Sequence, residues 1–188
     1  MADLAKYGQC LRSSLPVIAF MRWIAVSLVV IAACVAALLL SQQKVLWHVT
    51  EPGMTLPDVR AVLPEAVPPA QPKSLANGLS LGLVVPKASN LDRAFDAELY
   101  FDDAGLQQVL LLPTRLLTTS AAMMEFDELR QAASRRYGRE LPVTGTPSAD
   151  VPAEARWMAG PVMIALRVEN RGAHAAVVMS YSSAKGRF

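Results

Sequence analysis

The chain contains very few cysteine and histidine residues, and this scarcity excludes several kinds of functional site. Its 188 residues include two cysteines and two histidines. Cys10 and Cys34 both precede residue 45, so residues 45–188 can hold neither a disulfide framework nor a cysteine-based metal site. His48 and His174 have no neighbour at metal-ligand spacing, and no nucleophile signature surrounds them. We therefore expect a non-enzymatic protein without a cofactor or a metal.

An excess of charge of either sign is also missing. The chain has 18 basic and 16 acidic residues, for a net charge of +2. Four of the basic residues and one acidic residue lie within residues 1–44, which leaves 14 basic and 15 acidic residues for the remainder. A nucleic-acid-binding domain usually carries a basic face, and this near-neutral balance does not require one. The sequence thus predicts no nucleic-acid partner.

One long apolar run is present instead. From Trp23 to Leu40 the chain has 18 residues without a charge or a proline, which is near the lower length limit for a membrane-spanning helix. Trp23 and Trp47 flank the run, as aromatic residues often do at the two membrane interfaces. Arg12 and Arg22 precede it, so the positive-inside rule places the N-terminus in the cytoplasm.

We therefore predict a single-pass protein of the bacterial inner membrane. The predicted segments are a cytoplasmic part at 1–22, a span at 23–40, a linker at 41–52 and a periplasmic domain at 53–188. Small residues within the span would allow close packing against other helices. They include Ala25, Ala32, Ala33 and Ala36.

A lipid anchor is the alternative interpretation of the same run. Residues 31–34, "IAAC", resemble a bacterial lipobox, and a start at Met21 instead of Met1 would make the preceding residues a short lipoprotein signal. The mature protein would then begin "CVAALLL", which is apolar where a polar tether is usual. We favour the span, and acylation of Cys34 stays open, as does the choice of start.

Residues 53–90 predict one short helix and one strand. Thr55 is a good N-cap, and Asp58 three residues later completes a capping-box pattern. Leu56, Val59 and Leu63 recur at helical spacing, and Pro64 ends the helix. The Pro-rich stretch 64–78 indicates a loop, and 79–86 indicates a short strand.

The clearest local pattern is a β-hairpin. Phe95, Ala97, Leu99 and Phe101 alternate with Asp96, Glu98 and Tyr100, which predicts a strand with one buried face and one solvent face. Residues 102–105, "DDAG", supply the turn. The acidic residues here could alternatively hold a divalent cation, but their spacing matches no known metal loop, so we favour an ordinary turn.

A second helix is predicted over 120–137, with Thr119 or Ser120 as its N-cap and Gly138 at its C-terminus. Its apolar stripe consists of Ala122, Phe126, Leu129, Ala133 and Tyr137. A basic cluster marks its C-terminal part, formed by Arg130, Arg135, Arg136 and Arg139. We consider this cluster a candidate partner contact. The favoured alternative is that it complements the helix dipole and pairs with Asp127 and Glu128.

Three strands are predicted after that helix. They cover 154–160, 162–169 and 174–181, with turns at Gly160-Pro161 and at 170–172, "NRG". Helices on one face of an antiparallel sheet make a two-layer α+β domain, here in the order α-ββ-α-βββ. The order suggests an internal duplication of helix and strands, although no sequence repeat accompanies it.

The stretch "GMTLPDVRAVLP", residues 53–64, resembles the helix-opening motif of the SmpA/OmlA family of β-barrel-assembly lipoproteins. The matching positions are Gly53, Met54, Thr55, Val59 and Leu63. The resemblance implies the fold that this family shares with the β-lactamase-inhibitor proteins, in which helices pack on an antiparallel sheet. This chain departs from the motif at Pro64, where the family has a Gly-x-Pro turn, and no binding residues are carried over.

Together these patterns predict a non-enzymatic accessory or scaffolding subunit of a larger membrane or envelope complex. Its expected partners are membrane lipid and other envelope proteins. Two alternatives remain: an envelope-biogenesis lipoprotein acylated at Cys34, and a periplasmic small-ligand binder or hydrolase.

Overall fold

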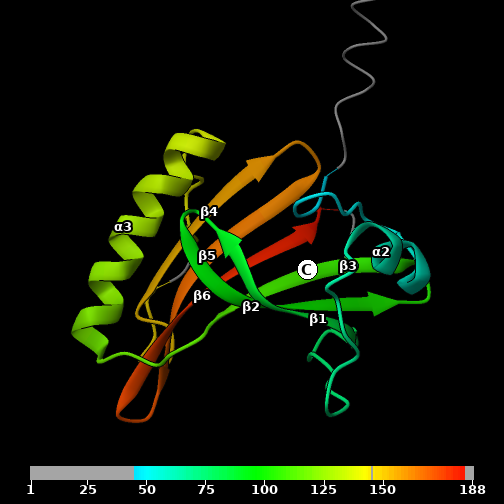
Figure 1. Cartoon of the computed structure of the whole chain (residues 1–188). Coiled ribbons are helices and arrows are strands. Elements are labelled where there is room, and N and C mark those ends of the chain that lie inside the picture. Colours follow the sequence, from blue (N-terminus) through cyan, green and yellow to red (C-terminus); the bar gives the residue numbers. More distant parts are fainter. Residues whose placement is uncertain (1–44, 145, 185–188) are drawn as a thin grey trace, which may run out of the picture. The chain divides into compact units, whose positions relative to one another are not determined.

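The computed structural model describes residues 45–144 and 146–184 (Figure 1). The elements of the described ranges are α2 (Leu56–Val62), β1 (Ser80–Asn90), β2 (Arg93–Asp102), β3 (Gly105–Pro113), α3 (Thr119–Tyr137), β4 (Ala153–Ala159), β5 (Val162–Arg171) and β6 (His174–Ser183). They form an α+β domain with a six-stranded antiparallel sheet, which confirms the predicted fold class.

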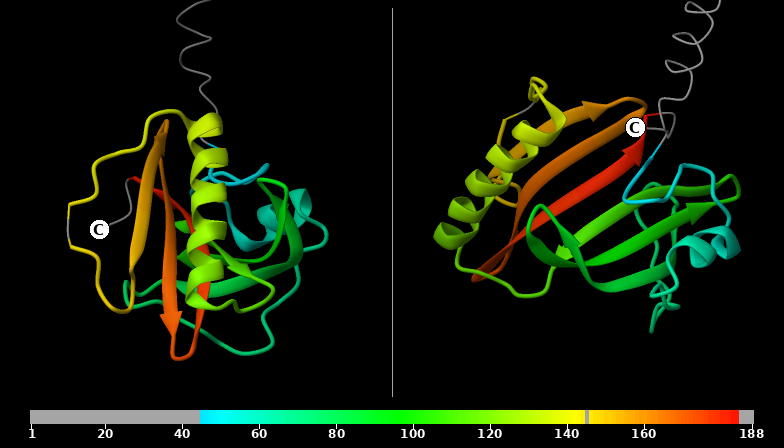
Figure 2. Two further views of the ribbon diagram at one scale, coloured as in Figure 1. Left: turned by 90° about the vertical axis from the view of Figure 1, so that its left-hand side faces the viewer. Right: turned by 45° about the horizontal axis from the view of Figure 1, so that its top comes forward.

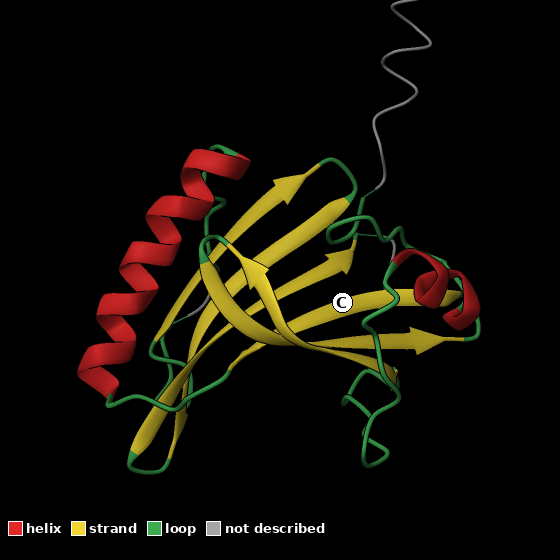
Figure 3. Ribbon diagram, viewed as in Figure 1, coloured by secondary structure: helices red, strands yellow, loops and turns green. Residues whose placement is uncertain are grey.

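The strands lie in the order β1-β2-β3-β6-β5-β4 (Figure 1), and Figure 3 draws them in yellow beside the two helices in red. The described chain is thus two α-β-β-β units, α2-β1-β2-β3 and α3-β4-β5-β6, joined where β3 pairs with β6. The suggested duplication of element order is present. The predicted order α-ββ-α-βββ was wrong by one strand, because β1 is a full member of the sheet.

β1 extends four residues beyond the strand predicted at 79–86. Pro86 normally ends a strand, because proline cannot donate to the ladder. Here a bulge between Val85 and Ala88 accommodates it. Lys87 takes φ +54, and its backbone N–H donates to Asp96 Oδ1 at 3.0 Å. The partner strand therefore supplies the side chain that lets β1 continue.

The core lies on the face of the sheet that the helices cover, which we call the inner face. α3 packs against β4, β5 and β6, as Figure 2 shows. The predicted stripe of α3 is confirmed: Ala122, Phe126, Leu129 and Ala133 are buried, and Tyr137 is partly buried against the core. The predicted N-cap was one or two residues late, because Thr118 accepts the hydrogen bond from the backbone N–H of Ala121.

The tip of the β1–β2 hairpin is fastened to the second α-β-β-β unit. Asn90 Nδ2 donates to Tyr181 Oη at 2.9 Å, and the hydroxyls of Tyr181 and Tyr137 lie 2.9 Å apart. Burial, together with the Tyr137 contact, raises the pKa of Tyr181 well above its ordinary value. Arg93 also forms an ion pair with Glu128 of α3. These contacts hold the tip of the β1–β2 hairpin against α3 and β6.

The motif that precedes α2 has a tertiary role. The backbone N–H of Gly53 donates to the carbonyl of Leu106 at 2.8 Å, and the N–H of Leu106 donates to the carbonyl of Met54 at 2.9 Å. The predicted capping box is confirmed: Asp58 accepts from the backbone N–H of Thr55, and the Thr55 hydroxyl accepts from that of Asp58. The motif therefore fixes the start of α2 on the β2–β3 turn.

Because of this capping box, we expect the free energy of unfolding to fall at low pH. The Thr55 hydrogen bonds lower the pKa of Asp58 below its ordinary value of 3.8. A lowered folded-state pKa contributes stability that is present above the unfolded-state pKa and lost as the pH falls through the folded-state pKa. We expect Asp58→Asn to lose less stability than the unaltered protein between about pH 5 and pH 2. Urea unfolding midpoints across this range would measure it, with Asp103→Asn as an exposed control. Equal acid dependence in Asp58→Asn and the unaltered protein would contradict the expectation.

The folded body begins earlier than the sequence predicted. Leu46 is 2% exposed and Trp47 is 4% exposed, and both belong to the main core cluster. The Thr50 hydroxyl donates to the Trp47 carbonyl at 2.6 Å, and His48 Nε2 lies 3.0 Å from the Ser89 carbonyl oxygen. Two expectations are corrected: Trp47 is a core residue and not an interfacial flank, and residues 46–50 are part of the fold and not of a linker.

A second correction concerns Tyr100, which the alternation placed on a solvent face. It is fully buried, because part of the Pro-rich segment 64–79 covers the first three strands. Val67 exchanges two backbone hydrogen bonds with Val84, and Leu81 donates to the Lys73 carbonyl. Leu75 and Leu79 then pack with Tyr100 and Leu110. Proline-rich composition predicted the loop but not its covering role.

The predicted span and the candidate anchor residue lie outside the described residues. This applies to the segments 1–22 and 23–40, including Trp23, Ala25, Ala32, Ala33, Ala36 and Leu40, and to Cys34. Within residues 45–144 and 146–184, neither helix combines the length and the apolar character that crossing a membrane requires.

Candidate ligand pocket on the outer face of the sheet

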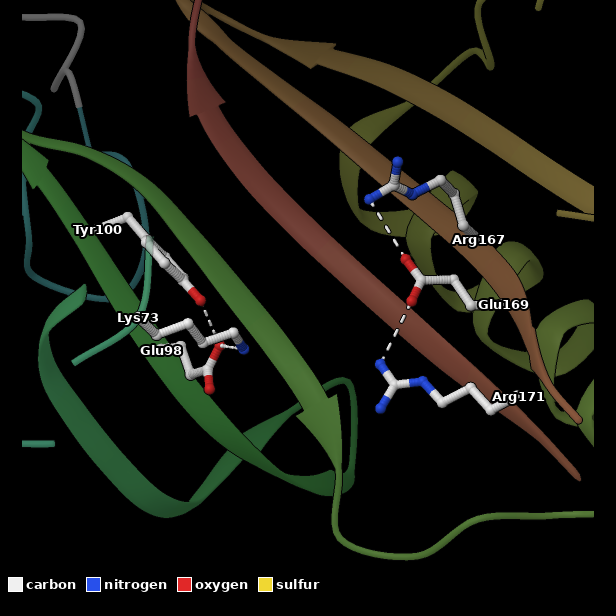
Figure 4. A network of polar contacts seen from close by, with 6 residues as sticks. All are labelled: Lys73, Glu98, Tyr100, Arg167, Glu169 and Arg171. Atoms are coloured by element: carbon white, nitrogen blue, oxygen red, sulfur yellow. Dashed lines mark hydrogen bonds and ion pairs between the residues drawn. The ribbon is translucent and has the colours of Figure 1, made fainter. Parts of the chain in front are cut away.

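Charged side chains gather on the face of the sheet opposite the core, which we call the outer face. Side chains alternate between the two faces of a strand. Because Trp157, Leu166 and Val168 point into the core, their alternating neighbours on β4 and β5 point outward. These outward residues are Glu154, Arg156, Arg167, Glu169 and Arg171. Figure 4 shows three of them beside β6, with α3 behind the strands.

These five residues form three ion pairs. Arg156 Nε donates to Glu154 Oε1 at 2.8 Å. Glu169 lies between two arginines, at 3.5 Å from Arg167 and 3.3 Å from Arg171 (Figure 4). The strand register places Glu154 directly opposite Arg167. Three guanidinium groups thus share two carboxylates, and the group carries one net positive charge.

A pocket of about 360 Å³ opens beside these arginines, and we call it the arginine pocket. Its described lining consists of Val143, Thr144, Thr146, Pro147, Ser148, Val151, Glu154, Arg156 and Arg167. Its floor comes from β4 and β5, and its wall comes from the connection between α3 and β4, which passes round the edge of the sheet (Figure 2). The volume is within the range of small-molecule sites.

The wall of the arginine pocket is anchored on both sides. At one end the backbone N–H of Leu141 donates to the Arg156 carbonyl at 2.7 Å. At the other end the backbone N–H of Asn170 donates to the Asp150 carbonyl at 2.8 Å, and its side-chain amide donates to the carbonyl of Ala149. Backbone hydrogen bonds therefore hold the wall against β4 at one end and β5 at the other.

Two polar atoms near the pocket are buried without a hydrogen-bond partner among the described residues: Arg167 Nε and Asn170 Oδ1. A buried donor without an acceptor costs about 1–3 kcal/mol, more when it belongs to a charged group. Arg167 contacts Glu169 through one terminal nitrogen, and the other points away from that carboxylate in Figure 4. Hydrogen-bonding capacity therefore remains on Arg167.

A second polar group flanks β2 on the same outer face. Lys73 Nζ and the Tyr100 hydroxyl both donate to Glu98 Oε2 at 2.6 Å (Figure 4). Burial raises the pKa of Tyr100 far above its ordinary value, and its hydrogen bond to Glu98 raises it further. The Tyr100 proton therefore stays in place, and this group fastens the covering segment to the sheet.

The basic cluster predicted on α3 is partly engaged within the domain. Arg130 pairs with Glu140 at 2.7 Å, and the hydrogen bond raises the pKa of Arg130. The Arg136 guanidinium lies 5.6 Å from the centre of the Tyr137 ring. The expected pairing of these arginines with Asp127 and Glu128 is confirmed only in part: the charge of Asp127 also raises the pKa of Arg130, although less than Glu140 does. Glu128 pairs instead with Arg93 from β2. Arg135 and Arg139 are exposed, so a contact with a partner stays a prediction for them.

The other candidate residues do not assemble into a site. Among the described residues, neither His48 nor His174 has a hydrogen bond to a carboxylate. The acidic residues of the hairpin have separate partners: Asp96 accepts from Lys87, and Asp102 accepts from Ala104 and Gln107. Within residues 45–144 and 146–184 no three potential metal ligands lie together. Residues 102–105 form the predicted turn of the hairpin between β2 and β3.

Sequence reasoning missed the arginine pocket, although part of its signal was present. Glu154 and Arg156 are two residues apart within one predicted strand, and Arg167 and Glu169 within the next, so period two already placed each pair on one face. The sequence did not show that Glu154 and Arg167 stand opposite each other. It also did not show that residues 143, 144, 146–148 and 151 form a wall over them.

No family model matches this chain, and neither the curated proteins nor the solved structures include a significant match.

Proposed function

We propose that this protein is a non-enzymatic, single-pass membrane protein whose α+β domain acts as an accessory or scaffolding subunit of a larger envelope complex. The observation that carries the proposal is the start of the core at Leu46 and Trp47. Only five residues, 41–45, separate these core positions from Leu40, the last residue of the predicted span.

A tether this short restricts where the domain can work. Five residues reach at most about 18 Å when fully extended. A domain held this close to the bilayer can contact only those parts of neighbouring proteins that lie near the membrane surface. The brevity of residues 41–45 therefore supports a membrane-proximal scaffolding role more than an independent catalytic domain.

The surface next to this start offers an apolar contact. Val49 is 55% exposed, although Leu46 and Trp47 beside it are buried. Arg135 and Arg139 of α3 are further candidates, because they are exposed and carry the charge that an acidic partner would recognise. We propose partner proteins of the envelope, and not nucleic acid, as the binding class.

The lipoprotein alternative has a specific sequence basis. Ile31-Ala32-Ala33-Cys34 would give a mature protein acylated at Cys34, and the resemblance of residues 53–64 to SmpA/OmlA proteins favours that class. The intact mass of the protein purified from membranes distinguishes the two. A mass near 20.3 kDa supports the uncleaved span, and a product beginning at Cys34 with added acyl mass replaces it.

Lengthening the tether tests the scaffolding role. We expect ten inserted Gly/Ser residues after Gln43 to leave the protein in the membrane fraction but to release it from its complex, because a flexible insert relaxes the geometry. Native gels of mild detergent extracts would measure the complex. The same insertion after the exposed Gln71 is the control and should leave the complex intact. An unaltered protein that migrates alone, or a complex indifferent to the insert after Gln43, would argue against the proposal.

A further inference from the structure

We infer that the arginine pocket binds a small, soluble molecule carrying a carboxylate or phosphate group. This assignment is independent of the membrane anchor and of the scaffolding role. The pocket, its two arginines and its hydroxyl-bearing wall provide the shape and the chemistry that such a ligand requires.

The arginines supply the recognition of an oxyanion. A guanidinium group presents five donors in a planar fork that matches the oxygens of carboxylate and phosphate. Arg156 uses Nε for Glu154, and among the described residues its terminal nitrogens have no partner. Arg167 keeps an enclosed Nε without an acceptor. An oxyanion in the pocket would accept hydrogen bonds from the terminal nitrogens of Arg156 and from the terminal nitrogen of Arg167 that points away from Glu169 (Figure 4), whereas the enclosed Nε lies out of its reach.

Charge balance favours an anion over a cation. Of the charged side chains that line the pocket, Arg156 and Arg167 are opposed by Glu154 alone, so the described lining carries one net positive charge. An incoming anion would neutralise this positive charge and accept hydrogen bonds from the arginine side chains.

The wall offers both hydroxyl groups and the apolar side chains of Val143, Pro147 and Val151 to a ligand. Thr144, Thr146 and Ser148 contribute hydroxyl groups, which can donate to or accept from a ligand. Ser148 Oγ already accepts from the backbone N–H of Val151 at 3.0 Å, which fixes its position. The volume of about 360 Å³ suits a short organic acid or a phosphate monoester.

Two neighbouring arginines provide a matched pair of variants. Arg167 and Arg171 both contact Glu169, but Arg167 lines the pocket and Arg171 does not. Arg167→Gln and Arg171→Gln therefore each remove one positive charge that faces the Glu169 carboxylate. Only the first removes a pocket donor.

The test is calorimetric titration of the full chain in neutral-detergent micelles with inorganic phosphate and with succinate. We expect saturable binding of at least one probe, weakened at least about tenfold by Arg167→Gln and changed less than about twofold by Arg171→Gln, because only Arg167 of these two lines the pocket and can donate a charged hydrogen bond there. If Arg167→Gln does not fold, Arg167→Lys replaces it, because lysine keeps the charge without the planar fork.

Three results would overturn the inference. The first is no saturable binding of either probe up to about 10 mM, a concentration that would detect even a weak site. The second is equal loss of binding in both glutamine variants, which would indicate general charge attraction. The third is binding to vesicles of phosphatidylglycerol and phosphatidylcholine without binding to phosphate or succinate, which would make the ligand a membrane surface.

Discussion

Gly105→Ala should destabilise the domain by about 4 kcal/mol or more, which is at the upper end for a single substitution. Gly105 has φ +100, a conformation that residues with a side chain rarely adopt. A Cβ at this position would meet the backbone of Gly53 and would lie 2.8 Å from the carbonyl oxygen of Met54. Backbone atoms of this kind cannot move aside without breaking the hydrogen bonds that hold the motif before α2 to Leu106.

Gly78→Ala is the matched control for this prediction. Gly78 has a similar φ of +86, but a Cβ there meets nothing within 4 Å. It should cost only the backbone strain, about 1–2 kcal/mol. Urea unfolding followed by tryptophan fluorescence would measure both variants, because Trp47 and Trp157 are buried. If the two variants lose equal stability, the close approach of Gly53 to Gly105 contributes nothing.

This pair of glycines illustrates what the sequence could predict about the fold. Local patterns located the capping box at Thr55, the hairpin turn at 102–105 and the C-terminal Gly138 of α3, since each depends on a few adjacent residues. They could not show that Gly53 docks on Gly105, because this contact joins positions 52 residues apart in the sequence. The extra strand length of β1 was missed for a similar reason: Asp96 of the neighbouring strand stabilises its bulge.

Alternation along a strand predicted which side chains are exposed on the outer face only where no loop packs against that face. Alternation in β2 correctly placed Phe95, Ala97 and Leu99 in the core, but Tyr100 is buried as well. The covering segments 64–79 and 139–152 have loop-like composition, and composition does not say where a loop packs. Both the cover over Tyr100 and the wall of the arginine pocket depend on tertiary contacts. The sequence therefore predicted the strands that carry the candidate site but not the site itself.

Trp47 is the second position where a large effect is expected. It is 4% exposed and packs in the main core cluster with Leu46. Trp47→Ala should cost about 3–5 kcal/mol, the usual loss when a buried tryptophan is truncated to alanine. An interfacial tryptophan outside the fold would cost almost nothing in the stability of the domain. Urea unfolding monitored by circular dichroism would separate these two descriptions of the residue.

Trp47→Phe makes the expectation sharper, because the Trp47 indole N–H is buried without a partner among the described residues. Phenylalanine removes that unsatisfied donor while keeping most of the apolar volume, so we expect a loss of about 1 kcal/mol or less. Trp157→Phe should cost more, about 2 kcal/mol, because Trp157 Nε1 donates to Ser134 Oγ at 3.3 Å and that bond would be lost. A larger loss at Trp47 than at Trp157 would mean that the Trp47 N–H has an acceptor. If Trp47→Ala is as mild as Trp47→Phe, the core does not begin at residue 46 and the short tether loses its main support.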